Sequence, residues 1–183
     1  KAVGSAGLEE LAPGAQVSVR KAAQEMIALQ VHGATGLHIV CTRSFNHSGE
    51  GHGASYLLPT LVRRARSLPK QGGALTIGNR TVVRDYLHVA DVVDAYLALL
   101  ESAKAGEVYN VCSGRGLTVG DLAERVLNRM DVTADISSDS SLLRPIDVPI
   151  LVGDNSKLRG TSGWAPKRSI DDIIDDLIHA AAD

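Results

Sequence analysis

An almost unbroken apolar run at residues 37–41 constrains the fold of this chain more than any other feature of its sequence. The run reads Leu-His-Ile-Val-Cys and follows a glycine. A strand without polar alternation is typical of a parallel sheet whose two faces are both covered by helices. We therefore expect 37–41 to be a strand buried on both faces. Shorter strands are expected at 75–77 and 108–112, with helices between them, and this alternation predicts an α/β fold.

The helices are indicated by apolar side chains that recur at helical spacing. This spacing predicts helices over residues 17–32, 56–68, 89–100, 118–130 and 170–178. Two of them begin with a capping pattern, because Thr118 is followed three residues later by Asp121, and Ser169 by Asp172. The acidic side chains of the last helix are expected to form a solvated face.

Composition and charge exclude several classes of protein. The chain has 183 residues, with 19 basic and 21 acidic side chains and a formal net charge of −2. This balance and an aromatic content of 3% argue against a nucleic-acid partner. No apolar run approaches the roughly 18 residues that a membrane-spanning helix needs, so we expect no membrane partner.

The cysteines and histidines indicate neither a disulfide scaffold nor a metal site. Cys41 and Cys112 are the two cysteines, each in an apolar run and without CxxC spacing. Buried free thiols are typical of a reducing compartment. The six histidines show no metal-ligand spacing, so no metal is expected. We expect a soluble, cytoplasmic protein.

A glycine-rich stretch from Gly49 to Ala54 formally fits the G-x-G-x-x-(G/A) dinucleotide fingerprint. The fingerprint also requires an acidic residue about 20 positions later to bind a ribose hydroxyl. No Asp or Glu occurs between Ala54 and Arg84. We therefore interpret the stretch as a flexible loop over a ligand cleft.

Three separated polar groups are candidates for holding a diphosphate. Asn46 follows the strand expected at 37–41, Arg84 precedes a helix beside Asp85, and Arg144 lies in a proline-stiffened loop. An arginine forms charge-assisted forked hydrogen bonds to phosphate, and Asp85 could steady Arg84. The alternatives are a loop asparagine and a surface salt bridge. Each residue alone is a weak signal, and the set predicts a diphosphate clamp.

Several blocks, taken in order, resemble a known family. They are Lys21-Ala22-Ala23-Gln24-Glu25-Met26, Arg43-Ser44-Phe45-Asn46-His47, Arg84-Asp85-Tyr86-Leu87-His88, Glu107-Val108-Tyr109-Asn110-Val111, and the stretch from Arg144-Pro145 to Lys157-Leu158. Their order resembles the extended short-chain dehydrogenases/reductases that act on nucleotide sugars, the epimerase/dehydratase group. The pattern is most similar to GDP-6-deoxy-mannose reductases, with GDP-mannose 4,6-dehydratases next, and it matches only the C-terminal portion of such enzymes.

The resemblance implies the C-terminal part of a Rossmann-type parallel sheet together with a small α/β substrate domain. It implies that residues 1–45 are a remnant of the dinucleotide-binding domain and that 46–183 form mainly the substrate domain. The strand at 108–112 would return to the Rossmann sheet. It also implies NADP or NAD as cofactor and a nucleotide-diphosphate sugar, here a GDP-hexose, as substrate, and it leaves a homo-oligomer open.

The resemblance also assigns roles to matched residues. Lys21 would act in catalysis and contact the nicotinamide ribose, and His47 would lie near the cofactor. Asn46, Arg84 and Arg144 would hold the nucleotide diphosphate.

Two features of the family have no counterpart in this sequence. The glycine-rich fingerprint is absent, and Val17 stands where the family has its catalytic tyrosine, four residues before Lys21. Valine can neither donate nor accept a proton. Ser5, in Val-Gly-Ser-Ala-Gly, resembles the active-site serine of the family but lies closer to Lys21 than is usual. We expect no hydride transfer by this chain alone; a non-catalytic nucleotide-sugar-binding module or a structural remnant remains the alternative.

Overall fold

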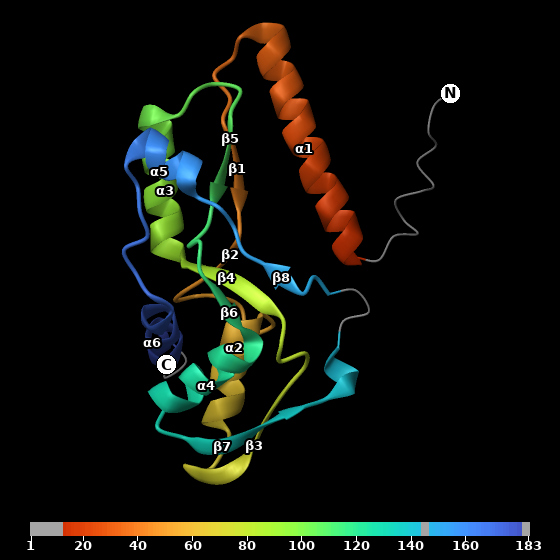
Figure 1. The fold of residues 1–183 in the computed structure, drawn as a ribbon, viewed down its shortest axis with the longest axis vertical. Coiled ribbons are helices and arrows are strands. Elements are labelled where there is room, and N and C mark those ends of the chain that lie inside the picture. The colour runs from red at the N-terminus through yellow and green to blue at the C-terminus, as the bar shows by residue number, and fades with distance from the viewer. Residues whose placement is uncertain (1–12, 144–146, 181–183) are drawn as a thin grey trace, which may run out of the picture.

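The computed structural model of the chain describes residues 13–143 and 147–180, with side chains from residue 18 onward (Figure 1). The elements, in order, are α1 (Pro13–Thr35), β1 (Cys41–Ser44), β2 (Asn46–Ser48), α2 (Leu57–Arg66), β3 (Gln71–Ile77), β4 (Val83–His88), α3 (Val89–Ser102), β5 (Val108–Val111), β6 (Gly116–Thr118), α4 (Val119–Arg129), β7 (Thr133–Ser138), the 3-10 turn η2 (Ser140–Leu142), β8 (Ile150–Leu151), α5 (Ser156–Ser162) and α6 (Ile170–Ala180). Helices and strands alternate along most of the chain. The fold is α/β, as the sequence predicts.

Parallel strand pairs organise both ends of the molecule. At one end β1 pairs in parallel with β5, beside α1, α3 and α5 (Figure 1). At the other end β3 pairs in parallel with β7, beside α2 and α4. Between them, β4 pairs in parallel with β2 and β8 and antiparallel with β6. The central strand β4 therefore joins the two ends.

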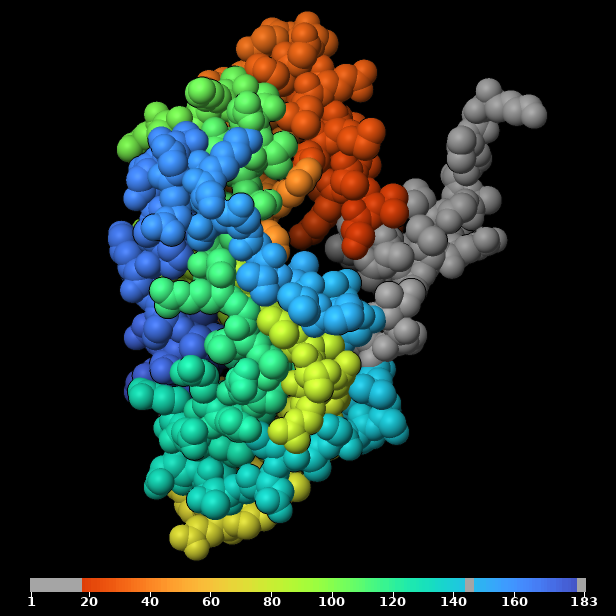
Figure 2. Space-filling view, in the orientation of Figure 1, coloured from red at the N-terminus to blue at the C-terminus, as the bar shows by residue number. Residues whose placement is uncertain are grey.

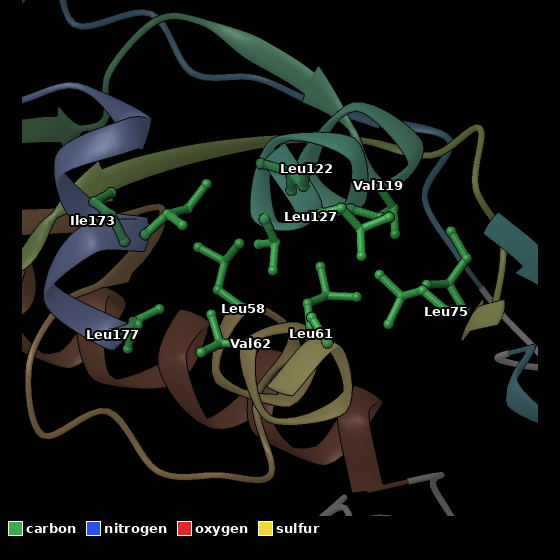
Figure 3. Packing of buried hydrophobic residues seen from close by; sticks show 14 of the residues in the cluster. Leu58, Leu61, Val62, Leu75, Val119, Leu122, Leu127, Ile173 and Leu177 are labelled. Atoms are coloured by element: carbon green, nitrogen blue, oxygen red, sulfur yellow. The ribbon is translucent and has the colours of Figure 1, made fainter. Parts of the chain in front are cut away.

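Two clusters of buried apolar side chains stabilise these ends. The larger one lies among α2, α4, α6 and β3 (Figure 3). Leu58, Leu122 and Ile174 in this cluster are fully buried. The smaller cluster joins β4, α3, β5 and α5 around the buried Tyr109 and Leu158. Burial of each such large side chain contributes about 1.5–3 kcal/mol relative to exposure.

The helix predictions are confirmed, and so are both capping patterns. At the start of α4, Thr118 Oγ1 accepts from the Asp121 amide at 3.0 Å while the Asp121 carboxylate accepts from the Thr118 amide at 3.1 Å. At α6 the Ser169 amide donates to Asp172 at 2.7 Å, and the Asp172 amide donates to Ser169 Oγ at 3.2 Å. These reciprocal bonds satisfy amides that otherwise have no partner in the first turn.

The prediction of a strand at 37–41 buried on both faces is wrong in both the position and the burial of the strand. The strand is β1, which begins at Cys41, and Leu37 is 59% exposed. Only Ile39 extends the pairing backward, because its carbonyl accepts from Gly106 at 2.7 Å. Among the described residues β1 pairs with β5 alone, so it is not an inner strand of a larger sheet in this part of the chain. Cys41 is accordingly only half-buried, whereas Cys112 is buried.

Short strands account for most of the other differences between the predicted and the observed elements. The strands β2, β4, β6, β7 and β8 fall where no strand is predicted. Each of them is held by pairing with a segment distant in sequence; Ile136 of β7, for example, lies opposite Leu75 of β3. Such strands carry little local pattern of their own.

The acidic side of the last helix is an ion-paired face and not a freely solvated one. Arg125 of α4 donates to Asp171 at 2.9 Å, and Arg129 pairs with Asp175. These side chains remain 31–47% exposed, so each pair contributes at most about 1 kcal/mol. The pairs nevertheless align α6 against α4.

Large apolar side chains remain exposed on α1 and α3. Met26 and Ile27 of α1 are 71% and 60% exposed, and Leu97 and Leu100 of α3 are 56% and 81% exposed. Among the described residues, no helix combines the length and the apolar character needed to cross a membrane.

Candidate functional site

The candidate site is a cleft of about 600 Å³ between α1 and the segment that links β1 to β2. Figure 2 shows the surface hollowed where α1 lies beside the rest of the chain. The cleft is lined by Lys21, Arg43, Ser44, Phe45, Asn46, His47, His52, Tyr56, Tyr86 and Leu151. A second hollow of about 750 Å³ adjoins it and shares Lys21, Arg43, Ser44 and His47. The structure therefore brings three of the predicted site residues, Lys21, Asn46 and His47, to one place.

An ion pair fixes α1 against β1 beside the cleft. Arg43 donates to the Glu25 carboxylate through Nε at 2.8 Å and through Nη2 at 2.6 Å. This forked hydrogen bond lowers the pKa of Glu25. Glu25 lies four residues after Lys21, so the two side chains share a face of α1. The pair thus orients the face of α1 that presents Lys21 to the cleft.

Strand pairing fixes the position of Asn46 and His47. Asn46 lies opposite Tyr86 and His47 opposite Leu87 in the parallel pair of β2 and β4. His47 Nδ1 lies 3.0 Å from the Phe45 carbonyl oxygen, and because a carbonyl can only accept, Nδ1 carries the proton in this contact. Its Nε2 is then an acceptor for a ligand hydroxyl or amide.

His52 and Tyr56 complete the cleft wall, and the sequence analysis did not identify either residue. Their rings stack with centroids 4.2 Å apart, and His52 Nδ1 lies 2.7 Å from Ser48 Oγ. Burial lowers the pKa of His52, and the nearby His47 lowers it further, so His52 is neutral at pH 7. The sequence analysis interpreted the glycine-rich stretch before Tyr56 as a loop over a ligand cleft. It thus located this part of the cleft but did not single out His52 or Tyr56.

Arg84 does not line this cleft. Its guanidinium pairs with Asp147 and donates to the carbonyls of Val83 and Val148, each at 2.8 Å, and its side chain is only 14% exposed. Asp85 does not steady Arg84, and that expectation is wrong. Successive side chains of a strand point to opposite faces, and Asp85 is fully buried on the other face of β4.

The Asp85 carboxylate instead binds two turns of the chain. It accepts the amides of Ser113 and Gly114 at 2.9 Å and that of Gly153 at 3.2 Å. It also accepts the Ser113 hydroxyl at 2.6 Å.

Ser5 and Arg144 lie outside the described residues, and so does the side chain of Val17. Within the part of the chain that the structure describes, no cluster of His, Cys, Asp or Glu could hold a metal ion.

The family model for GDP-mannose 4,6 dehydratase matches residues 9–177. The chain belongs to this family. A relative 34% identical over 166 residues is the GDP-6-deoxy-D-mannose reductase of Pseudomonas aeruginosa; the match covers 88% of this chain and 55% of the relative. The chain spans about half the length of the relatives that it matches.

Solved structures of the short-chain dehydrogenase/reductase fold agree with this membership. The structure of RMD from Pseudomonas aeruginosa complexed with NADPH has a TM-score of 0.79 at 30% identity, covering 88% of this chain and 54% of that one. The UDP-glucose 4-epimerase of Thermotoga maritima with UDP-glucose has a TM-score of 0.78 at 25% identity, covering 90% and 52%. The family thus comprises nucleotide-sugar dehydratases, reductases and epimerases that use nicotinamide cofactors.

Proposed function

We propose that this chain supplies the substrate-binding part of an NADP(H)-dependent enzyme that reduces or dehydrates a GDP-hexose at C4. The observation that carries the proposal is that Lys21, Asn46 and His47 line one cleft in a member of this family. The cleft lies at the carboxyl end of the parallel strand β1, where open α/β sheets bind ligands. The GDP-6-deoxy-D-mannose reductase relative and the NADPH-bound neighbour support the choice of base and cofactor.

We extend the proposal to the division of the chain. Residues 1–45 would belong to the dinucleotide-binding domain, and 46–183 mainly to the substrate domain. The strand β5 would return to the Rossmann sheet, which agrees with its parallel pairing to β1. The two free cysteines support a reducing, cytoplasmic location.

The described residues fit only one end of a nicotinamide cofactor. Lys21 and His47 line both adjoining hollows and can reach the hydroxyls of a ribose there. The glycine-rich stretch from Gly49 to Ala54 lies between β2 and α2, but no Asp or Glu follows it before Asp85, so it lacks the acidic residue that binds a ribose hydroxyl in the fingerprint. When bound, the cofactor would supply or accept the hydride at C4. Lys21 and His47 would hold its nicotinamide ribose, and the remaining contacts would come from elsewhere.

Asn46, Arg84 and Arg144 would hold the nucleotide diphosphate. The Asn46 amide can donate to a phosphate oxygen directly from the cleft. Arg84 is held by Asp147, so it would exchange this carboxylate for a phosphate when the ligand binds. Asp147 and a phosphate are both anionic acceptors for the Arg84 guanidinium. Arg84 therefore remains paired with an anion after the exchange.

We further propose that this chain alone does not transfer hydride. Lys21 and Ser5 would be its catalytic-site residues, but Val17 offers no proton to the C4 oxygen. This substitution also favours a second candidate function, a nucleotide-sugar-binding module without chemistry. Cofactor affinity separates the two, because such a module should ignore NADPH at concentrations that saturate an enzyme of this family.

The test is a calorimetric titration of the chain with GDP-mannose. Arg84→Ala and Asn46→Ala should each weaken binding, by about tenfold to a hundredfold for the arginine, because a charge-assisted phosphate contact contributes about 1.5–3 kcal/mol. Arg63→Ala, on the exposed side of α2, is the matched control and should bind like the parent. Thermal melting of each variant separates lost contacts from lost structure.

Two outcomes would contradict the proposal. Absence of heat with GDP-mannose at millimolar concentration would favour a structural remnant, and sedimentation would then show whether the exposed apolar faces cause self-association. NADPH oxidation above that of a boiled sample would refute the inactivity of the chain alone.

A further inference from the structure

A larger cleft, which we call the arginine cleft, lies between the turn after β5, the segment before α5 and the segment leading into α6. Its volume is about 800 Å³. It is lined by Tyr86, Ser113, Gly114, Arg115, Leu117, Arg125, Gly153, Asp154, Asn155, Arg159, Ala165, Pro166, Lys167, Arg168, Ser169, Ile170 and Asp171. Among the lining residues only Tyr86 also lines the candidate site, so the two clefts are separate.

Cationic side chains dominate the polar lining of the arginine cleft. Arg125 pairs with Asp171, and Lys167 pairs with Asp94. Arg168 pairs with the buried Asp91 at 2.6 Å and more distantly with Asp94 at 3.8 Å. Arg115 and Arg159 form no ion pair with any residue in the described ranges. Arg125 contacts Asp171 through Nη1, which leaves its other guanidinium donors for a ligand.

The one further carboxylate in the lining is directed elsewhere. Asp154 accepts the Ser156 amide at 2.8 Å and its hydroxyl at 2.5 Å, which lowers the pKa of Asp154. Its carboxylate is thus directed toward Ser156 at the start of α5, and it does not pair with Arg115 or Arg159. Within the described part of the chain, the guanidinium groups of Arg115 and Arg159 therefore have no anionic partner in this concave site.

Two fully buried carboxylates fix the walls that carry these arginines. Asp85 Oδ2 accepts the backbone amides of Gly114 and Gly153 and so ties together the turn after β5 and the segment before α5. Asp91 accepts the amides of Lys167 at 3.0 Å and Arg168 at 2.9 Å. The backbone of the cleft is thus held in place before any ligand arrives, which lowers the ordering cost of binding.

We propose that the arginine cleft binds a small molecule that carries two or more phosphate groups. Guanidinium forks match phosphate geometry, and the volume suits a ligand of nucleotide size. A nucleic acid fits less well, because Tyr86 is the one aromatic residue of the lining and the chain carries a net charge of −2. The proposal does not depend on the function proposed for the cleft beside α1.

Trp164 offers a direct optical reporter for this cleft. It is the one tryptophan of the chain and precedes the lining segment that starts at Ala165. Its side chain is buried, and Nε1 donates to the Asp91 carbonyl at 3.2 Å. A ligand that engages Lys167 or Arg168 should therefore change its fluorescence.

The experiment titrates the chain with inorganic pyrophosphate and follows both heat and Trp164 fluorescence. We expect saturable binding that weakens as ionic strength rises. An Arg115→Ala/Arg159→Ala double variant should bind at least about tenfold more weakly, since two charge-assisted contacts are lost. Arg63→Ala, an exposed arginine outside both clefts, should bind like the parent. Both arginines of the double variant are exposed, and unchanged thermal melting would confirm that it folds.

Four results would overturn the proposal. The first three are the absence of saturable binding at millimolar pyrophosphate, equal affinities of the parent and the double variant, and loss of binding in Asn46→Ala alone, which would place pyrophosphate at the candidate site. A single-stranded oligonucleotide that displaced pyrophosphate at lower concentration would refute a small-molecule site. GDP-mannose binding is measured separately, so either proposal can fail without the other.

Discussion

Replacing Asp85 with asparagine tests whether this carboxylate organises the turns around β4. The side chain is fully buried, and each of its oxygens accepts two hydrogen bonds. Oδ1 accepts the amide and hydroxyl of Ser113, and Oδ2 accepts the amides of Gly114 and Gly153. Asp85→Asn keeps the shape but turns one acceptor into an NH2 donor. In either orientation of the amide, a donor then faces donors.

The less costly orientation directs the new NH2 toward Ser113. The Ser113 hydroxyl can rotate and accept from it, but the Ser113 amide loses its acceptor. An orphaned buried amide costs about 1–3 kcal/mol. The bonds from Gly114 and Gly153 also become neutral, which costs about 1 kcal/mol more. We expect Asp85→Asn to lower the free energy of unfolding by about 2–4 kcal/mol, out of a total of roughly 5–15 kcal/mol.

Urea unfolding followed by both circular dichroism and Trp164 fluorescence measures this loss. Coincidence of the two signals supports the two-state analysis that the comparison needs. Asp135→Asn is the matched control, because Asp135 is exposed on β7, and it should change stability by less than about 0.5 kcal/mol. A loss below about 1 kcal/mol for Asp85→Asn would refute the argument. The buried side-chain polar atoms described here all have a partner at present, so the substitution creates a new orphan.

Three further predictions follow from single contacts. Gly153→Ala should destabilise by about 1–3 kcal/mol in the same assay, because its Cβ would lie 2.5 Å from Cys112 Sγ. Burial raises the pKa of Cys112 to about 12, so a thiol reagent at pH 8 should label Cys41 first and Cys112 only as the chain opens, as mass spectrometry would show. Ser169→Ala should cost about 1 kcal/mol near neutral pH. The hydrogen bonds from Ser169 lower the pKa of Asp172, so this cost should be present above the ordinary carboxyl pKa and shrink as pH falls through the lowered value, in melting curves across pH.

Amphipathic periodicity was sufficient for α1, α2, α3, α4 and α6, because an apolar stripe is encoded within each segment, but it missed α5 (Ser156–Ser162), whose buried residue is Leu158. Local pattern also located β5 and the end of β3, but it failed for β2, β4, β6, β7 and β8, whose formation depends on distant partners. Ile136, for instance, is placed by pairing with Leu75 and not by its neighbours in sequence. The prediction for the run at 37–41 failed for a related reason. It assumed that apolar residues are buried, but nothing in the described chain covers Leu37.

The candidate site was predicted in part. Asn46 and His47 follow a parallel strand, and Lys21 comes from a helix that the resemblance placed beside them; the three line one cleft. The partner of Arg84 was missed because β4 was not predicted. Without that strand, the alternation that turns Asp85 away from Arg84 could not be applied.

The segment formed by β4 and the start of α3 shows why binding and stability must be measured together in this protein. Arg84 holds Asp147, and Asp85 holds the turns at 113–114 and at 153. His88 Nδ1 accepts from the Ala90 amide, so its Nε2 carries the proton and donates to Asp176 of α6 at 2.9 Å. Arg84, Asp85 and His88 thus each fix a chain segment distant in sequence. A weaker affinity for GDP-mannose in Arg84→Ala is therefore a lost phosphate contact only if the unfolding midpoint stays constant, whereas a midpoint that falls in proportion to affinity identifies Arg84 as a structural link to Asp147.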